Sequence, residues 1–195
     1  MTCIVAIRDE KTKKTYMAGD SAGFDPWGRK LYRKDKKIFK IKTIMGQEIM
    51  MGFTTSYRMG QILQYSFKPS NYPVLAKPGE IMDYMVNHFI NGIRDCFKHN
   101  GFGEHTDSKT NEGGIFLVAI KDRLFMIESD FQVAEVESEY ASCGCGEDFA
   151  NAALLTMEKL NSKLQPKEKL ELALEVAKFY HSWIDGENTH LELKW

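Results

Sequence analysis

Apolar and polar residues alternate through two pairs of short segments in the first quarter of the chain. The run "TCIVAIRD" at 2–9 predicts a β-strand, and "KTYMAGDSAG" at 14–23 predicts its partner across a polar turn. A second pair is predicted at 37–42 and 47–56, with Gly46 in the turn between them. Both pairs indicate antiparallel hairpins.

Apolar residues spaced three and four apart predict helices later in the chain. One helix is predicted from 57 to about 67 and a long amphipathic one over 80–97, separated by a stretch with two prolines and a glycine. After a polar loop at 99–114, a hairpin of two buried strands is predicted over 115–129. The remaining predicted elements are helices at 149–160 and 166–183 and a strand at 189–195.

The order of these elements places strands in blocks and helices in pairs, without regular strand–helix alternation. This order favours antiparallel sheets with helical layers over a parallel sheet. The predicted class is α+β, as a four-layer αββα sandwich of two antiparallel sheets. Because no internal repeat or low-complexity segment divides the chain, residues 1–195 are predicted to form a single domain.

Charge and composition exclude few functions. The formal net charge of −1 gives no reason to expect nucleic acid or a membrane as a partner. No apolar run is long enough for a membrane span, and the start lacks the features of an export signal. The four cysteines, Cys3, Cys96, Cys143 and Cys145, are therefore expected to be reduced thiols in a cytoplasmic protein. The Cys143–Cys145 pair alone is a weak metal signal, so neither a metal nor a cofactor is predicted.

A threonine stands directly behind the first methionine, where the first predicted strand begins. Chain ends are usually frayed, so an end that enters a folded core indicates a function for it. Because threonine is small, we expect Met1 to be removed, which leaves Thr2 with a free α-amino group. A retained Met1 would block that amine.

Several segments, in order along nearly the whole chain, carry a resemblance to a known family. They are "TCIVAI" at the start, "MAGDSA" around Asp20, "KDKKIFKI" around Lys37, "MMGFTTS" around Gly52, "SCGCGEDFANAALL", and "ALEVAKFYHSWIDGENTHLEL". Together they resemble the proteasome β-subunit family of N-terminal-nucleophile hydrolases, especially the bacterial ring peptidase HslV. The resemblance implies the same four-layer fold.

The resemblance also implies roles for four residues. Thr2 would be the nucleophile, with its own α-amino group as general base. Lys37 and Asp20 match the family's buried lysine and the carboxylate that pairs with it, and a nearby cation would keep more of the amine neutral. Gly52 matches the glycine whose backbone N–H forms the oxyanion hole, where one donor contributes roughly 10²–10³ in rate.

The chain departs from the family pattern near the nucleophile. Cys145 stands where the family has a serine that supports the amine, and a thiol is the weaker hydrogen-bond partner. The family's aspartate in the closing helix falls at Phe179, whereas the serine three residues later is kept as Ser182. His181 and Asp185 are the candidates that could compensate.

By the same resemblance, Met50, Thr54 and Arg58 would line the pocket for the side chain before the cleaved bond. Methionine on a strand is more often core filler than a pocket wall, so no cleavage preference is predicted.

Taken singly, the catalytic candidates have simpler explanations. Asp20 could be an ordinary turn residue before Ser21. Lys37 lies in "RKLYRKDKKIFKIK" at 29–42, where eight of fourteen residues are Lys or Arg. Such a run is usually a solvated face, with nucleic-acid binding as the alternative. Only the combination with Thr2 favours catalysis.

The predicted function is a threonine-type endopeptidase that cleaves polypeptides inside a homo-oligomeric ring, with an unfolding ATPase as a candidate partner. Two alternatives remain: a non-catalytic ring or scaffold protein, and an N-terminal-nucleophile amidase for a small molecule.

Overall fold

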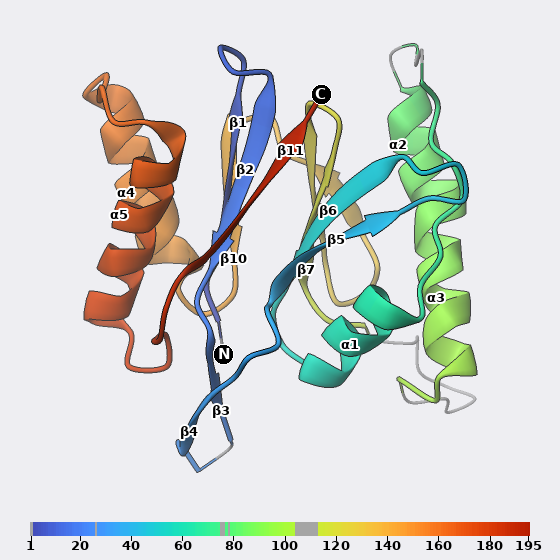
Figure 1. Ribbon diagram of the computed structural model, residues 1–195, viewed down its shortest axis with the longest axis horizontal. Helices are drawn as coiled ribbons and strands as arrows, with labels where there is room; N and C mark the ends of the chain where they lie inside the picture. The colour runs from blue at the N-terminus through green and yellow to red at the C-terminus, as the bar shows by residue number, and fades with distance from the viewer. Residues whose placement is uncertain (1, 26, 75–76, 78, 104–112) are drawn as a thin grey trace.

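Two antiparallel sheets face each other and carry helices on their outer sides (Figure 1). The computed structural model describes residues 2–25, 27–74, 77, 79–103 and 113–195. Met1 and much of the predicted polar loop, 104–112, lie outside the described residues. The predicted α+β class and αββα layering are confirmed.

The first sheet has the strand order β10-β1-β2-β11. Its strands are β10 (Tyr140–Cys143), β1 (Ile4–Asp9), β2 (Lys14–Gly19) and β11 (Thr189–Lys194). In the β1 register, Ile4 lies opposite Gly19 on one side and Cys143 on the other. Because β1 is paired on both edges, residue 2 enters the middle of a sheet.

The second sheet has the order β5-β6-β7-β8-β9. Its strands are β5 (Ile38–Lys42), β6 (Glu48–Phe53), β7 (Phe116–Ile120), β8 (Arg123–Ile127) and β9 (Val133–Glu135). The predicted hairpins β5–β6 and β7–β8 are both present, and Gly46 lies between the first two with φ +84°.

A short hairpin of β3 (Ala22–Phe24) and β4 (Lys30–Tyr32) projects beyond the two sheets, at the bottom of Figure 1 near the N-terminus. The predicted strand over 14–23 is therefore broken after Gly19. The reason is tertiary: the Ala22 N–H donates to the carbonyl of Asp185 at 3.0 Å, which draws the chain away from β1.

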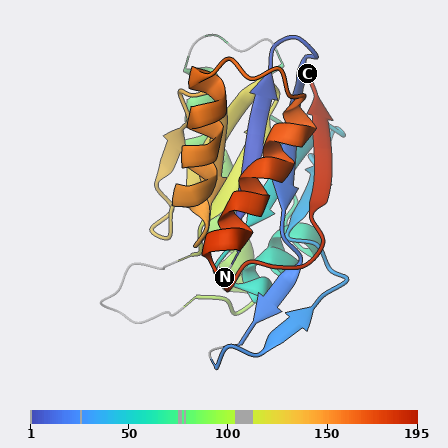
Figure 2. The same cartoon turned by 90° about the vertical axis from the view of Figure 1, so that its left-hand side faces the viewer.

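Helices cover both outer faces. α1 (Tyr57–Tyr65), α2 (Glu80–Tyr84), the π-helical η1 (Met85–Phe89) and α3 (Ile90–His99) lie on the five-stranded sheet. α4 (Glu147–Lys159) and α5 (Pro166–Tyr180) lie side by side on the four-stranded sheet (Figure 2). In the described part of the chain, every helix is too short or too polar to cross a lipid bilayer.

The alternation in the sequence divides the core into three layers. Along β1, Val5 and Ile7 pack with the α4–α5 layer, whereas Ile4 and Ala6 pack between the sheets. The third layer lies under α1–α3 and buries the rings of Phe89, Phe116 and Phe125 completely, among others. Burying each such ring contributes about 1.5–3 kcal/mol relative to exposure.

Candidate active site

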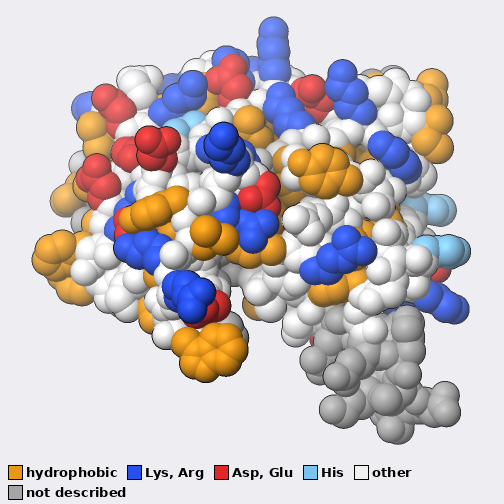
Figure 3. Space-filling model, turned by 60° about the horizontal axis from the view of Figure 1, so that its bottom comes forward, with side chains coloured by type: hydrophobic (Ala, Val, Ile, Leu, Met, Phe, Trp, Pro, Cys, Tyr) orange, Lys and Arg blue, Asp and Glu red, His pale blue; other side chains and the backbone are white. Residues whose placement is uncertain are grey.

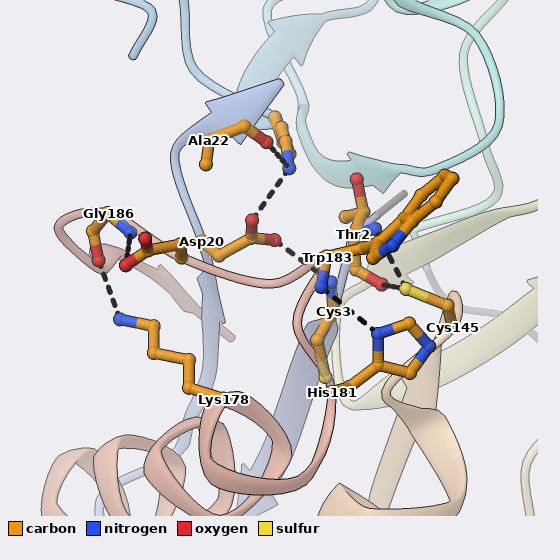
Figure 4. Close-up of polar contacts among 11 residues, drawn as sticks. Thr2, Cys3, Asp20, Ala22, Cys145, Lys178, His181, Trp183 and Gly186 are labelled. Atoms are coloured by element: carbon orange, nitrogen blue, oxygen red, sulfur yellow. Dashed lines mark hydrogen bonds and ion pairs between the residues drawn. The ribbon is translucent and has the colours of Figure 1, made fainter. Parts of the chain in front are cut away.

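Thr2 lies two residues before the first residue of β1 and is only 3% exposed. Its backbone N–H donates to Cys145 Sγ at 3.4 Å, and its carbonyl accepts from the same thiol at 3.5 Å (Figure 4). The backbone of Gly144 passes so close that a Cβ there would lie 2.2 Å from the Thr2 carbonyl oxygen. Gly144 also has φ +101°, so only glycine fits this turn. The turn between β10 and α4 thus holds residue 2 in place.

Asp20 and Lys37 form a buried ion pair behind the start of β1. The Lys37 ammonium lies 2.8 Å from Asp20 Oδ2 and donates to the carbonyl of Ala22 at 2.7 Å. The other carboxylate oxygen of Asp20 accepts the Cys3 N–H at 2.9 Å (Figure 4). The side chains of Lys37 and Asp20 are 1% and 0% exposed. One carboxylate therefore connects the lysine to the residue that follows Thr2.

Burial acts against both charges of this pair. It lowers the pKa of Lys37, while the Asp20 charge and hydrogen bond oppose that shift. Burial likewise raises the pKa of Asp20, opposed by Lys37 and by backbone hydrogen bonds that include the Cys3 N–H. The pair stays close because each charge satisfies the other in a site that excludes water.

Three thiols lie near this pair, in two kinds of environment. Cys3 and Cys143 are completely buried, and burial raises the pKa of each thiol well above its ordinary value. Cys145 is half-buried and contacts Thr2. Among the residues that the structure describes, no group of three or more His, Cys, Asp or Glu side chains could hold a metal ion.

Comparisons with known proteins agree with this arrangement at the level of the fold. BPH from Thiobacillus denitrificans has a TM-score of 0.76 at 17% identity, covering 99% of this chain and 98% of that chain. HslV from Trypanosoma brucei has a TM-score of 0.67 at 14% identity, covering 100% of both chains. Anbu, described as an ancestral β-subunit, from Yersinia bercovieri has a TM-score of 0.66 at 12% identity, covering 98% of this chain and 81% of that one.

The chain has an HslV-like, proteasome-type N-terminal-nucleophile hydrolase fold. No protein-family model matches the chain, and no curated protein does. Within the HslV-like fold, Thr2 contacts Cys145, and Asp20 joins Lys37 to Cys3, the residue after Thr2. The catalytic roles of these residues stay a prediction.

The N–H of Gly52 is directed into the sheet, which contradicts its predicted role as oxyanion donor. It is paired with Ile38 of β5 and Leu117 of β7. Successive N–H groups along this strand point to opposite sides. The Phe53 N–H donates to the Lys37 carbonyl on the β5 side, and the Thr54 N–H donates to the Ile115 carbonyl on the β7 side. The Gly52 N–H therefore points into the β7 ladder. Gly52 is required for packing instead, since a Cβ there would lie 2.6 Å from Ile4.

The three residues predicted to line the substrate pocket lie in three different environments. Met50 is completely buried between the two sheets, so it fills core space. Arg58 is exposed and donates to the carbonyl of Asn100, at the C-terminal end of α3. Thr54 lies at the site: its Oγ1 is 3.1 Å from the position of a Cβ on Gly144.

The segment after α5 also departs from expectation. Ser182 is exposed. The side chain of Phe179 is 82% exposed and lies against Tyr180. Asp185 pairs with Lys30 on the β3–β4 hairpin.

One residue that the sequence did not single out is Thr55, directly after β6. It has φ +74°, a conformation that costs about 1–3 kcal/mol for a residue with a side chain and that is concentrated at functional sites. Within the described residues, no acceptor pairs with its N–H. No local signal could have found it, because threonine is not a residue typical of this conformation.

Aromatic side chains stand on two sides of the site. The ring of Tyr57 lies 5.9 Å from the Lys37 ammonium and carries the Arg33 guanidinium at 3.8 Å. Trp183 lies on the Cys145 side in Figure 4 and stacks on Phe24, with ring centroids 6.1 Å apart. Neither arrangement is visible in the sequence, since each pair is formed by segments far apart along the chain.

Proposed function

We propose that this protein is a threonine-type endopeptidase subunit of a self-compartmentalised, proteasome-like ring, with Thr2 as nucleophile once Met1 has been removed. The observation that carries the proposal is a buried threonine at the start of β1, next to a buried Lys37–Asp20 pair. The HslV-like fold supports it. The removal of Met1 remains a prediction, because that residue lies outside the described ones.

The first half of the reaction is acyl transfer. The Thr2 hydroxyl attacks the substrate carbonyl while the α-amino group of Thr2 accepts the hydroxyl proton, which produces a tetrahedral intermediate with a negatively charged oxygen. The same amine then gives the proton to the leaving amine, the C–N bond breaks, and the acyl part of the substrate stays on Thr2 as an ester. In the second half, water attacks the ester with the amine again acting as base, and the free carboxylic acid leaves.

The surrounding residues prepare these steps. A free α-amino group titrates near about 8, and the positive charge of Lys37 keeps more of it neutral. Asp20 holds Lys37 and the Cys3 N–H together. Cys145 orients the nitrogen of Thr2. We assign the oxyanion donor to the N–H of Thr55, in place of Gly52.

The proposed substrates are polypeptides, and the active form is a homo-oligomeric ring. A Pseudomonas aeruginosa neighbour is described as a helical assembly of the Anbu complex, which supports self-association. Large apolar side chains exposed on α4 and α5, among them Leu155 and Phe179, support it as well. An unfolding ATPase partner and a cytoplasmic location complete the proposal. The four free cysteines support that location.

The deciding experiment compares wild type with Thr2→Ala on fluorogenic peptides, after intact mass has shown whether Met1 is lost. We expect turnover to fall at least about 10³-fold, because the nucleophile is gone. Thr156→Ala is the matched control, since this threonine is exposed on α4 and its hydroxyl donates to the Ala152 carbonyl of the same helix. Equal turnover by wild type and Thr2→Ala would overturn the proposal.

A covalent probe gives a second readout. BPH from Thiobacillus denitrificans has been solved in complex with epoxomicin. We expect epoxomicin to bind this protein at Thr2, so intact mass should show an adduct on wild type and none on Thr2→Ala. Wild type that has lost Met1 but forms no adduct and cleaves no peptide would favour the non-catalytic or small-molecule alternative.

A further inference from the structure

Phe24 and Trp183 form an aromatic wall beside the candidate nucleophile. Their rings stack with centroids 6.1 Å apart and planes inclined by 20°. Phe24 is the last residue of β3, and Trp183 lies in the turn after α5. Both side chains are half-buried, so each ring keeps accessible surface that a ligand could cover.

The turn that carries Trp183 is held firmly on both sides. The Trp183 N–H donates to His181 Nδ1 at 3.3 Å, and the Asp185 carbonyl accepts the Ala22 N–H at 3.0 Å. Ile184 is buried against Gly146, in the turn whose Cys145 contacts Thr2. The wall is therefore a preformed surface rather than a loose loop.

The position of the wall determines which part of a substrate it would meet. Trp183 lies on the side of Thr2 where Cys145 contacts its nitrogen (Figure 4). In the proposed mechanism that nitrogen gives its proton to the leaving amine, so the leaving segment must pass along this side.

We propose that the Phe24–Trp183 wall binds an aromatic or large apolar side chain of a polypeptide substrate, in the residue directly after the cleaved bond. This inference rests on the proposed function and names a specificity determinant for it. The chemistry fits because offset aromatic stacking adds to the burial of apolar area. Lysine and arginine side chains stand among apolar ones on the face of the molecule drawn in Figure 3. The Lys30 ammonium lies over the Phe24 ring, 5.9 Å from its centroid.

The test uses internally quenched peptides that differ only in the residue after the cleaved bond, as Phe, Leu or Ala. Wild type should prefer Phe over Ala by about 10-fold or more in kcat/KM. Trp183→Ala should bring that ratio close to one, chiefly through KM, and Trp183→Phe should restore most of it. Trp27→Ala is the matched control, because that indole is 89% exposed on the same hairpin. An unchanged Phe-to-Ala ratio in Trp183→Ala would overturn the inference.

A binding experiment separates this inference from the proposed function. The same peptides, labelled with a fluorophore, are titrated into Thr2→Ala and into Thr2→Ala/Trp183→Ala. Tighter binding of the Phe peptide that depends on Trp183 supports the wall even if wild type cleaves nothing, in which case only the proposed function fails. Equal affinity of the two variants for both peptides refutes the wall whatever wild type cleaves.

Discussion

Two lysine–aspartate pairs lie close to the candidate site and behave in opposite ways. Lys37 and Asp20 are 1% and 0% exposed, whereas Lys30 and Asp185 are 38% and 39% exposed. Burial lowers the pKa of Lys37 and raises that of Asp20. In the exposed pair the mutual hydrogen bond dominates, so the pKa of Lys30 is raised and that of Asp185 is lowered.

Burial therefore changes what the same two residue types do. In water, a lysine–aspartate contact adds little energy and mainly fastens one segment to another. Here it fastens the β3–β4 hairpin to the turn after α5. In the protein interior, away from water, a charge costs free energy of solvation, but its electric field acts on nearby groups with little screening. Only the buried pair can therefore tune an amine at Thr2.

The largest expected effect comes from breaking the buried pair on one side. Lys37→Met should abolish peptide turnover and lower the free energy of unfolding by about 3–5 kcal/mol, because Asp20 is left buried without its partner. Turnover assays and urea unfolding measure the two effects. Lys30→Met is the matched control and should change kcat/KM less than about threefold. Comparable losses in the two variants would remove the distinction between the pairs.

A double variant separates the stability of the buried pair from its function. Asp20→Asn/Lys37→Met should recover stability to within about 1 kcal/mol of wild type, because no uncompensated charge remains. The asparagine can still accept the Cys3 N–H. Turnover should stay lost, since no cation lowers the pKa of the amine. Recovered turnover in a stable double variant would show that Lys37 has only a structural role.

The smallest effect concerns the exposed pair and pH. Lys30 holds the pKa of Asp185 in the folded protein below the value of the unfolded chain, which is about 4. The contact between the two side chains therefore stabilises the fold fully when the pH is above that unfolded value. It is lost as pH falls through the lower, folded value. Asp185→Asn should thus lower Tm by less than about 2 °C at pH 6. Thermal unfolding across pH should show the difference vanishing towards pH 2, and a difference that grows in acid would contradict the assignment.

Much of the fold follows from local alternation in the sequence. The strands of the three predicted hairpins and the helices α1, α4 and α5 form within a few residues of their expected bounds. These elements could be predicted because a buried face imposes a period of 2 or 3.6 on the residues that make it. The break between β2 and β3 could not, since it depends on a hydrogen bond from Ala22 to the carbonyl of Asp185.

The residues of the candidate site could be predicted only in part, as Gly52 and Thr55 illustrate. Glycine indicates a close approach of the backbone, and the structure places Gly52 at one, between Ile4 and Ile38 in the core. The unusual backbone conformation falls three residues later, on Thr55. A sequence pattern records that a close contact exists, but not which face of the strand makes it.

The hydrophobic pattern of the chain is enough to predict the layered core, and its residue types include a threonine, an aspartate and a lysine that suit one chemistry. Which of these residues come into contact depends on how the sheets pack. Asp20 and Lys37 are 17 residues apart and Thr2 and Cys145 are 143 apart, yet each pair is in contact. Eight Lys or Arg residues between 29 and 42 share one local pattern. Packing of the two sheets takes Lys37 out of water while Lys30 stays exposed, because burial depends on distant strands rather than on neighbours in the chain.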